Sequence, residues 1–222
     1  MRYCLLLAML LWGCLCVAKE RVSFPTEDGG TIYGNLYGEG DRAVVLAHGG
    51  RFTLESWDKQ ARSLEASGFR VLAIEFRGEG ESHGGTAGSE GDEGRQQDIL
   101  GAIRYLRKNG SKQVSVVGAS MGGDYAARAA EVSPTAMDRL VLLSAGAYTT
   151  PRRMKGPKLY IIAREDANAE GPRLPRILAR YRKARGPKKL VLLDGSAHAQ
   201  FLFETDQSSR VLREILRFLL AP

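Results

Sequence analysis

The chain alternates between short apolar runs and longer segments in which apolar residues recur at helical spacing. Six apolar runs show little alternation with polar residues, which is typical of strands that are covered on both faces. These runs lie at residues 43–50, 70–78, 114–120, 140–146, 159–166 and 190–198. Amphipathic patterns predict helices at residues 54–67, 94–108, 123–131, 173–189 and 208–220. The alternation predicts an α/β protein with a mostly parallel central sheet and helices on both faces.

Two segments near the N-terminus follow a different pattern. Residues 21–29 and 31–40 read as short strands joined by the turn-forming residues Asp28, Gly29 and Gly30. We expect them to add antiparallel strands at one edge of the sheet. Residues 19–222 are enough for one hydrophobic core and show no internal repeat, so we predict a single domain.

The first eighteen residues, "MRYCLLLAMLLWGCLCVA", read as a leader. Their apolar run is shorter than the roughly 20 residues that a membrane-spanning helix needs. Cleavage after Ala18 would give a soluble exported protein, whereas residues 11–14 loosely resemble a lipoprotein cleavage box and would place a lipid on Cys14. An uncleaved anchor is the third outcome. We therefore expect residues 1–18 to be a signal peptide or lipoprotein leader, and the protein to be periplasmic, secreted or lipid-anchored.

All three cysteines, Cys4, Cys14 and Cys16, lie in this leader. A chain cut after Ala18 would therefore have no cysteine nucleophile, no disulfide and no cysteine-based metal site. The sequence contains three histidines, which do not make a histidine-rich metal site. We therefore expect no metal site.

The formal net charge is +7, and much of it lies in residues 173–189, "RLPRILARYRKARGPKK". Within this segment Leu174, Ile177, Leu178 and Tyr181 form an apolar stripe. The simplest interpretation is a surface helix with a solvated basic face, and the alternative is contact between that face and an anionic membrane surface. No aromatic-rich strip or nucleic-acid motif accompanies the charge, so we expect no nucleic-acid partner.

The segment "GASMG" at residues 118–122 matches the pattern G-x-S-x-G directly after an apolar run. In that pattern a strand turns abruptly into a helix and presents the serine hydroxyl, here that of Ser120. Small flanking residues allow the strand and helix to approach closely. The new helix directs its free amides and positive dipole end toward the site. The pattern predicts Ser120 as a nucleophile, with a simple helix cap as the alternative.

A serine hydroxyl needs a general base within hydrogen-bond reach and a group that orients the base. His198 follows the last apolar run in "GSAH" and is the predicted base. Asp166 ends "ARED" after the preceding run, so that the chain order is nucleophile, acid, histidine. Glu165 is adjacent and Asp194 is nearer to His198 in sequence, but Asp166 is the predicted orienting acid.

The segment "HGG" at residues 48–50 ends an early central run. We expect the backbone amides of Gly50 and Met121 to form an oxyanion hole, with Arg51 as the alternative to Gly50. His48 itself is assigned a structural role.

Together, "HGG", "EFRGEGES", "GASMGG", "ARED" and "GSAH" resemble the α/β-hydrolase superfamily, in the family's order and over nearly all of residues 19–222. The resemblance implies the α/β-hydrolase fold and a Ser-His-Asp hydrolase that forms an acyl-enzyme without metal or cofactor. Arg77, Glu79 and Ser82, within the second of these segments, are expected to have a structural role.

Many members of that superfamily insert a cap domain before the strand that carries the acid. Here the interval contains only "AYTTPRRMKGPK", residues 147–158, so we expect no cap and an open cleft. The site then looks like those of small carboxylesterases, thioesterases and dienelactone-hydrolase-like proteins, which implies a small, accessible ester or thioester substrate. Arg152, Arg153 and Lys155 are expected near the rim, either as solvated charge or as contacts for an anionic acyl group.

Two other functions stay open at this point. A peptidase or perhydrolase would use the same three side chains, and a catalytically silent binding scaffold would not need all of them. Neither the acyl length, the leaving group nor the oligomeric state follows from the sequence.

Overall fold

The computed structural model describes residues 19–86 and 94–222 of the 222-residue chain. The predicted leader lies outside the described residues. Within these ranges no helix is long and apolar enough to cross a lipid bilayer.

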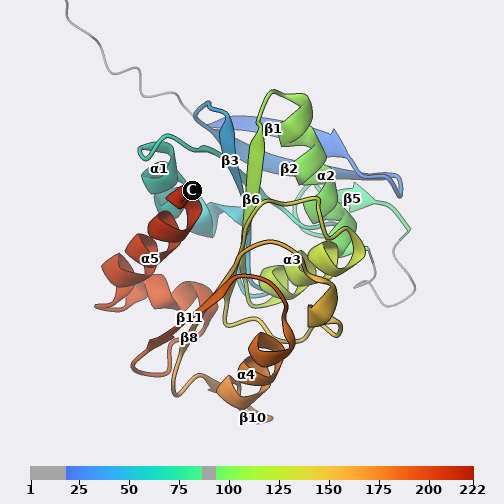
Figure 1. The fold of residues 1–222 in the computed structure, drawn as a ribbon. Helices are drawn as coiled ribbons and strands as arrows, with labels where there is room; N and C mark the ends of the chain where they lie inside the picture. The colour runs from blue at the N-terminus through green and yellow to red at the C-terminus, as the bar shows by residue number, and fades with distance from the viewer. Residues whose placement is uncertain (1–18, 87–93) are drawn as a thin grey trace, which may run out of the picture.

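A single mixed sheet runs through the centre of the molecule in the order β1-β2-β4-β3-β6-β7-β8-β11 (Figure 1). From β4 to β11 all neighbours are parallel, whereas β1 and β2 run antiparallel at one edge. The strands are β1 Glu20–Pro25, β2 Gly30–Tyr37, β3 Arg42–Ala47, β4 Arg70–Ile74, β6 Gln113–Ala119, β7 Leu140–Leu143, β8 Lys158–Ala163 and β11 Lys188–Leu193. Two-residue strands complete the set: β5 His83–Gly84 on β2, and the hairpin of β9 Ala167–Asn168 with β10 Gly171–Pro172. The predicted sheet, with its antiparallel edge, is confirmed.

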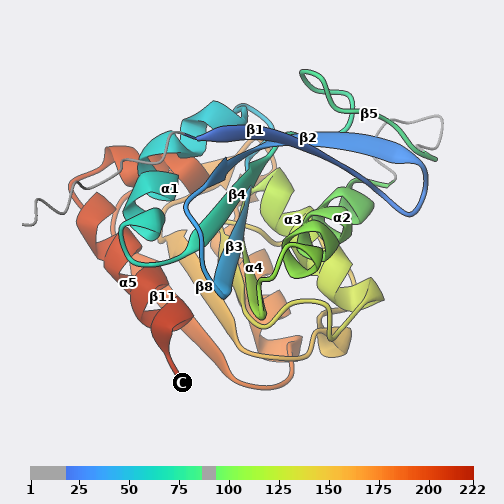
Figure 2. The same ribbon diagram turned by 90° about the horizontal axis from the view of Figure 1, so that it is seen from above.

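Helices cover both faces of this sheet (Figures 1 and 2). One face carries α1 Asp58–Glu65 and α5 Ser208–Leu220, and the other carries α2 Arg95–Lys108, α3 Met121–Val132 and α4 Leu174–Lys183. Three short 3-10 helices are η1 Leu54–Trp57, η2 Pro151–Arg153 and η3 Ala199–Glu204. The two-faced α/β arrangement is therefore the one that the sequence predicts.

The central strands separate two apolar clusters. In β3, Val45 and Ala47 belong to the cluster beneath α2 and α3, whereas Val44 and Leu46 belong to the cluster beneath α1 and α5. Successive side chains of a strand point to opposite faces, so every residue of such a strand must be apolar. This explains why the central runs show no polar alternation.

Element boundaries differ from the predictions at two helices. The basic helix predicted over residues 173–189 ends at Lys183, because Gly186 adopts a left-handed φ of 76° and Pro187 cannot continue a helix. Residues 188–189 begin β11 instead. The helix predicted from residue 54 starts as η1 and becomes α-helical only at Asp58. Between β7 and β8 the structure places only η2, so no cap domain is present in the described residues.

Candidate active site

Ser120 lies at the junction of β6 and α3, in backbone geometry that few residues adopt. Its φ of 48° and ψ of −115° lie outside the regions that L-residues favour. A Cβ atom on Gly118 would lie 2.6 Å from the Gly123 Cα, and one on Gly123 would lie 2.6 Å from the Ala145 Cβ. Strand and helix therefore meet too closely for side chains at these positions, and the strained turn exposes the hydroxyl of Ser120 above the sheet.

His198 joins Ser120 to Asp166 in one line of hydrogen bonds. Its Nε2 lies 2.8 Å from Ser120 Oγ, and its Nδ1 lies 2.8 Å and 3.0 Å from the two carboxylate oxygens of Asp166. Asp166 is fully buried, whereas the His198 side chain is 26% exposed. Because β6, β8 and β11 are parallel, the residues that follow them meet at the same edge of the sheet.

The two alternative acids lie elsewhere. The Asp194 carboxylate is exposed and lies 3.5 Å from the Arg164 guanidinium, and Glu165 is exposed at the end of β8. Asp166 is therefore the acid that contacts the imidazole of His198.

This arrangement can activate a hydroxyl. A carboxylate that accepts a hydrogen bond from Nδ1 of His198 leaves Nε2 with a free lone pair that faces Ser120 Oγ. The imidazole can then take the Ser120 proton as the oxygen attacks an electrophilic carbon, and the buried Asp166 stabilises the imidazolium that forms.

The loop of Gly50 lies against the start of α3. A Cβ atom on Gly50 would meet the Met121 side chain at 3.4 Å, and the amide of Gly122 donates to the His48 carbonyl over 3.1 Å. Gly50 and Met121 border one pocket of about 440 Å³ together with Ser120 and His198. The structure brings the two predicted oxyanion positions together beside Ser120, and their donor role stays a prediction.

Gln200 connects the two loops of the site, and the sequence analysis did not identify it. Its Oε1 accepts a hydrogen bond from the Gly49 amide at 2.7 Å, and its Nε2 donates to Ser56 Oγ at 2.5 Å. The side chain is buried. Gln200 lies two residues after His198, and Gly49 directly precedes Gly50. The buried hydrogen bond between them therefore fixes the spacing between the His198 loop and the Gly50 loop.

Ser144 holds the other side of the His198 loop. Its Oγ accepts a hydrogen bond from the Ala199 amide at 3.1 Å, and its own amide donates to Ile161 over 2.9 Å. Ser144 and Ala199 both have positive φ, 51° and 54°. Residues other than glycine adopt this conformation only where surrounding contacts hold them. Strained backbone at Ser144 and at Ala199, the two residues that this hydrogen bond joins, therefore determines the position of His198.

The polar residues after β4 have structural contacts. Arg77 forms ion pairs of 2.6 Å with both Asp28 and Asp98, and its hydrogen bonds hold the pKa of Asp28 well below the ordinary value. The fully buried His48 lies with its Nε2 3.1 Å from a carboxylate oxygen of Glu79. These contacts join the loops after β1, β3 and β4, and none of Arg77, His48 and Glu79 lines the pocket that contains Ser120.

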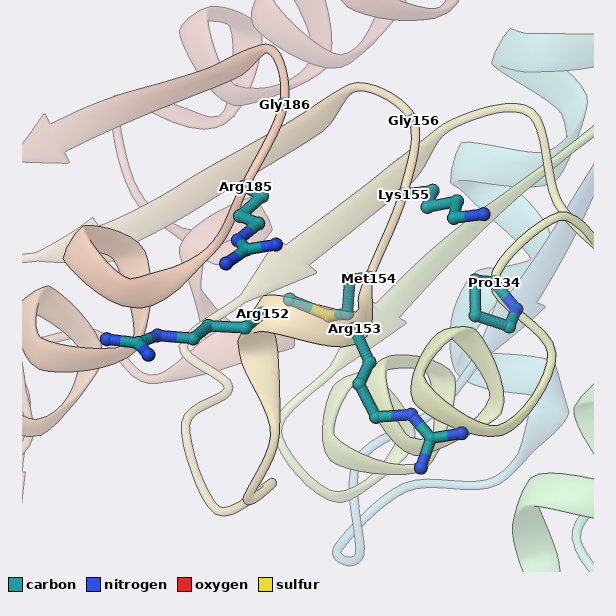
Figure 3. A pocket seen from close by; sticks show the side chains of 8 residues that line it. All are labelled: Pro134, Arg152, Arg153, Met154, Lys155, Gly156, Arg185 and Gly186. Atoms are coloured by element: carbon teal, nitrogen blue, oxygen red, sulfur yellow. The ribbon is translucent and has the colours of Figure 1, made fainter.

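Arg152, Arg153 and Lys155 do not lie near the rim of the site, so that expectation is wrong. They line a separate hollow of about 490 Å³ together with the turn residues Gly156 and Gly186 (Figure 3). Those two turns precede β8 and β11, whereas the candidate site follows the same strands at their other end. After β7 the chain turns back along the face of the sheet that carries α3, and η2 packs against that helix. Contact of the basic face of residues 173–189 with an anionic membrane surface stays a prediction.

Residues 19–86 and 94–222 contain no group of three His, Cys, Asp or Glu side chains that is arranged to hold a metal ion.

Comparison with protein families finds one match over most of the chain. A family described as alpha/beta hydrolase fold matches residues 42–217. A 2-hydroxy-6-oxononadienedioate/2-hydroxy-6-oxononatrienedioate hydrolase from a Pseudomonas species is 33% identical over 140 residues, which are 60% of this chain and 48% of that protein. The chain thus spans about half the length of the curated relatives that it matches.

Solved structures of low sequence identity share the fold. An esterase from Pyrococcus furiosus superposes with a TM-score of 0.73 at 20% identity and covers 91% of both chains. An esterase from Exiguobacterium antarcticum gives a TM-score of 0.73 at 15% identity over 91% of this chain and 100% of its own. These similarities extend the fold match to the strands that precede residue 42.

Proposed function

Because this chain belongs to the alpha/beta hydrolase fold family, we propose that it is a serine hydrolase that cleaves small, accessible carboxylic esters or thioesters through an acyl-enzyme. The observation that carries the proposal is the unbroken line from Ser120 Oγ through His198 to Asp166, with both links at 2.8 Å. A binding scaffold would not require a strained serine whose hydroxyl is hydrogen-bonded to an oriented imidazole.

In the proposed reaction, Ser120 Oγ attacks the carbonyl carbon while its proton passes to His198 Nε2. The amides of Gly50 and Met121 hold the negative oxygen of the tetrahedral intermediate. Collapse of this intermediate breaks the bond to the alcohol or thiol, which leaves with the proton from His198. Water then attacks the acyl-enzyme, again giving its proton to His198, and the carboxylic acid and free Ser120 are released.

The pocket supports the choice of a small substrate. Its mouth is bordered by exposed residues, among them Gly50, Asn168 and Phe201. The ring of Phe52 packs 4.9 Å from that of Phe201, which gives one apolar wall. A short acyl chain fits against this wall, whereas no enclosed tunnel for a long chain is found in the described residues.

Labelling with a fluorophosphonate tests the nucleophile. We expect a mass increase of one probe per chain in the wild type and none in Ser120→Ala. Ser209→Ala is the matched control, because Ser209 is an exposed serine of α5 away from the triad. Labelling that persists in Ser120→Ala, or a wild type that is never labelled, would refute the proposed nucleophile and favour the binding scaffold.

A panel of short and long acyl esters, thioesters and aminoacyl amides then tests the reaction class. We expect short esters or thioesters to be cleaved fastest. Amide cleavage with negligible ester turnover would favour a peptidase instead, and peracid formation in the presence of hydrogen peroxide would favour a perhydrolase.

The Pseudomonas relative supports a second candidate, the hydrolysis of a carbon–carbon bond in a dienedioate. This relative is 33% identical over the 140 matched residues. The test is direct incubation with 2-hydroxy-6-oxononadienedioate, monitored by loss of its absorbance. Turnover faster than that of every ester in the panel would replace the first proposal with the second.

A further inference from the structure

The pocket above Ser120 is bordered by two guanidinium groups. Arg51 lies on the loop after β3, and Arg173 immediately precedes α4. None of the described residues that line this pocket is acidic. The Asp166 carboxylate beneath the pocket is fully buried, lies against His198 Nδ1 and forms an ion pair of 3.3 Å with Arg173. A substrate that enters the pocket therefore meets two guanidinium groups and no acidic side chain in the lining.

The side chain of Arg173 has unused hydrogen-bonding capacity. It is 19% exposed, and its Nε lies 3.3 Å from Asp166 Oδ1 in poor hydrogen-bond geometry, so that this buried nitrogen has no hydrogen-bond partner in the described chain. A guanidinium carries five N–H donors in a planar fork. Leaving such donors without partners in a partly buried site is unfavourable, and a planar carboxylate satisfies two at once.

Arg51 faces the same pocket from the opposite loop. It is exposed in a tight turn that is closed by the Phe52 amide, which donates to the Gly49 carbonyl over 3.0 Å. No carboxylate of the described chain lies within ion-pair distance of its side chain. The residue is adjacent to Gly50, so its charge lies close to the position proposed for the substrate carbonyl.

We propose that the preferred substrate carries a second, ionised carboxylate in addition to the ester or thioester that is cleaved. The carboxylate lies between Arg173 and Arg51, and Arg173 binds it through its free donors. This inference rests on the proposed function, because it assigns the substrate class of the same site. Arg51 and Arg173 are then specificity-determining residues that contact the part of the substrate that does not react.

A matched ester pair tests the proposal. Monoethyl adipate and ethyl 6-oxoheptanoate have the same number of non-hydrogen atoms and differ only in whether the chain ends in a carboxylate or an acetyl group. We expect the wild type to show a kcat/KM about tenfold or more higher for the anionic ester, and a lower ratio when salt rises from about 50 to about 500 mM. A loss of triad geometry in a variant would lower kcat/KM for both esters equally. Comparing the ratio of the two kcat/KM values therefore cancels this effect.

Two variants and one control separate specific contacts from general charge. In Arg51→Gln/Arg173→Gln the ratio should fall about tenfold or more, and in Arg51→Gln alone it should fall less. Arg176→Gln removes a positive charge three residues further along α4, where Arg176 pairs with Glu170 and does not line the pocket. Its ratio should remain that of the wild type.

A second readout does not depend on ester turnover. Adipate should slow fluorophosphonate labelling of Ser120 in the wild type and protect the double variant much less. A wild type that prefers the neutral ester, an unchanged ratio in the double variant, or protection that is equal in both proteins overturns the carboxylate proposal. If the two esters are cleaved without selectivity the hydrolase function stands, whereas absence of both turnover and labelling removes the function together with the inference.

Discussion

Replacing Gln200 by Leu should reduce catalysis more than substrate binding. The change removes the acceptor of the Gly49 amide, a hydrogen bond of 2.7 Å, and leaves that buried N–H without a partner. An unsatisfied buried donor costs about 1–3 kcal/mol, so we expect the free energy of unfolding to fall by about 2 kcal/mol. We expect the loop that carries Gly50 to shift so that this N–H reaches water, which would displace Gly50 relative to Met121.

The catalytic cost follows from the role proposed for Gly50. Complete loss of one oxyanion donor costs about 10²–10³ in kcat, and a displaced donor costs a part of that. We therefore expect kcat for a short ester to fall about tenfold to hundredfold. KM should change much less, because the negative oxygen develops only in the transition state.

Steady-state kinetics and urea unfolding on the same protein measure the two effects. Ser56→Ala is the control: it removes the acceptor of the Gln200 Nε2, and with it the hydrogen bond that Ser56 Oγ donates to the Thr53 carbonyl, but keeps the bond between Gln200 and Gly49. Its kcat should stay close to that of the wild type. A wild-type kcat in Gln200→Leu, or an equal loss of kcat in Ser56→Ala, would show that the Gly49 contact does not position the oxyanion loop.

Three further changes test other parts of the structure. Gly118→Val should destabilise the fold by several kcal/mol, because even the first carbon would lie 2.6 Å from backbone of Gly123; a thermal melt within a few degrees of the wild type would contradict this. Arg77→Met leaves Asp98 buried without its cation and should cost about 3–5 kcal/mol in urea unfolding, and a smaller loss in Arg77→Met/Asp98→Asn would confirm the cause. Burial and the neighbouring Lys188 lower the pKa of Lys158 from 10.5 to about 8, so the unfolded chain binds more protons between these values. Stability should therefore rise by on the order of 1–2 kcal/mol from pH 8 to pH 10.5 in the wild type, and this rise should be absent in Lys158→Met.

The strand ends explain why the candidate site could be predicted from sequence. Ser120, Asp166 and His198 each follow an apolar run, and parallel strands bring the ends of such runs to one edge. The glycines around Ser120 also carry a local signal, because close approach of strand and helix excludes side chains there. For these residues, local pattern and topology together were sufficient.

Other parts of the site depend on contacts that leave no local pattern. Gln200 binds an amide 151 residues away, and Ser144 binds one 55 residues away. The path of the chain after β7 also depends on such a contact. There the Thr150 amide donates to Glu131 at the end of α3, which holds the segment 151–155 at the opposite end of the sheet from Ser120. Such placements follow from tertiary packing and not from residue order.

The short connection through η2 between β7 and β8 bears on the lifetime of the proposed acyl-enzyme. In residues 19–86 and 94–222 no second domain folds over the site, and the pocket is bordered by exposed residues. Under the proposed function, we therefore expect water to reach the acyl group without a closing motion. We expect such an enzyme to release a free acid rather than to transfer the acyl group to a second organic molecule.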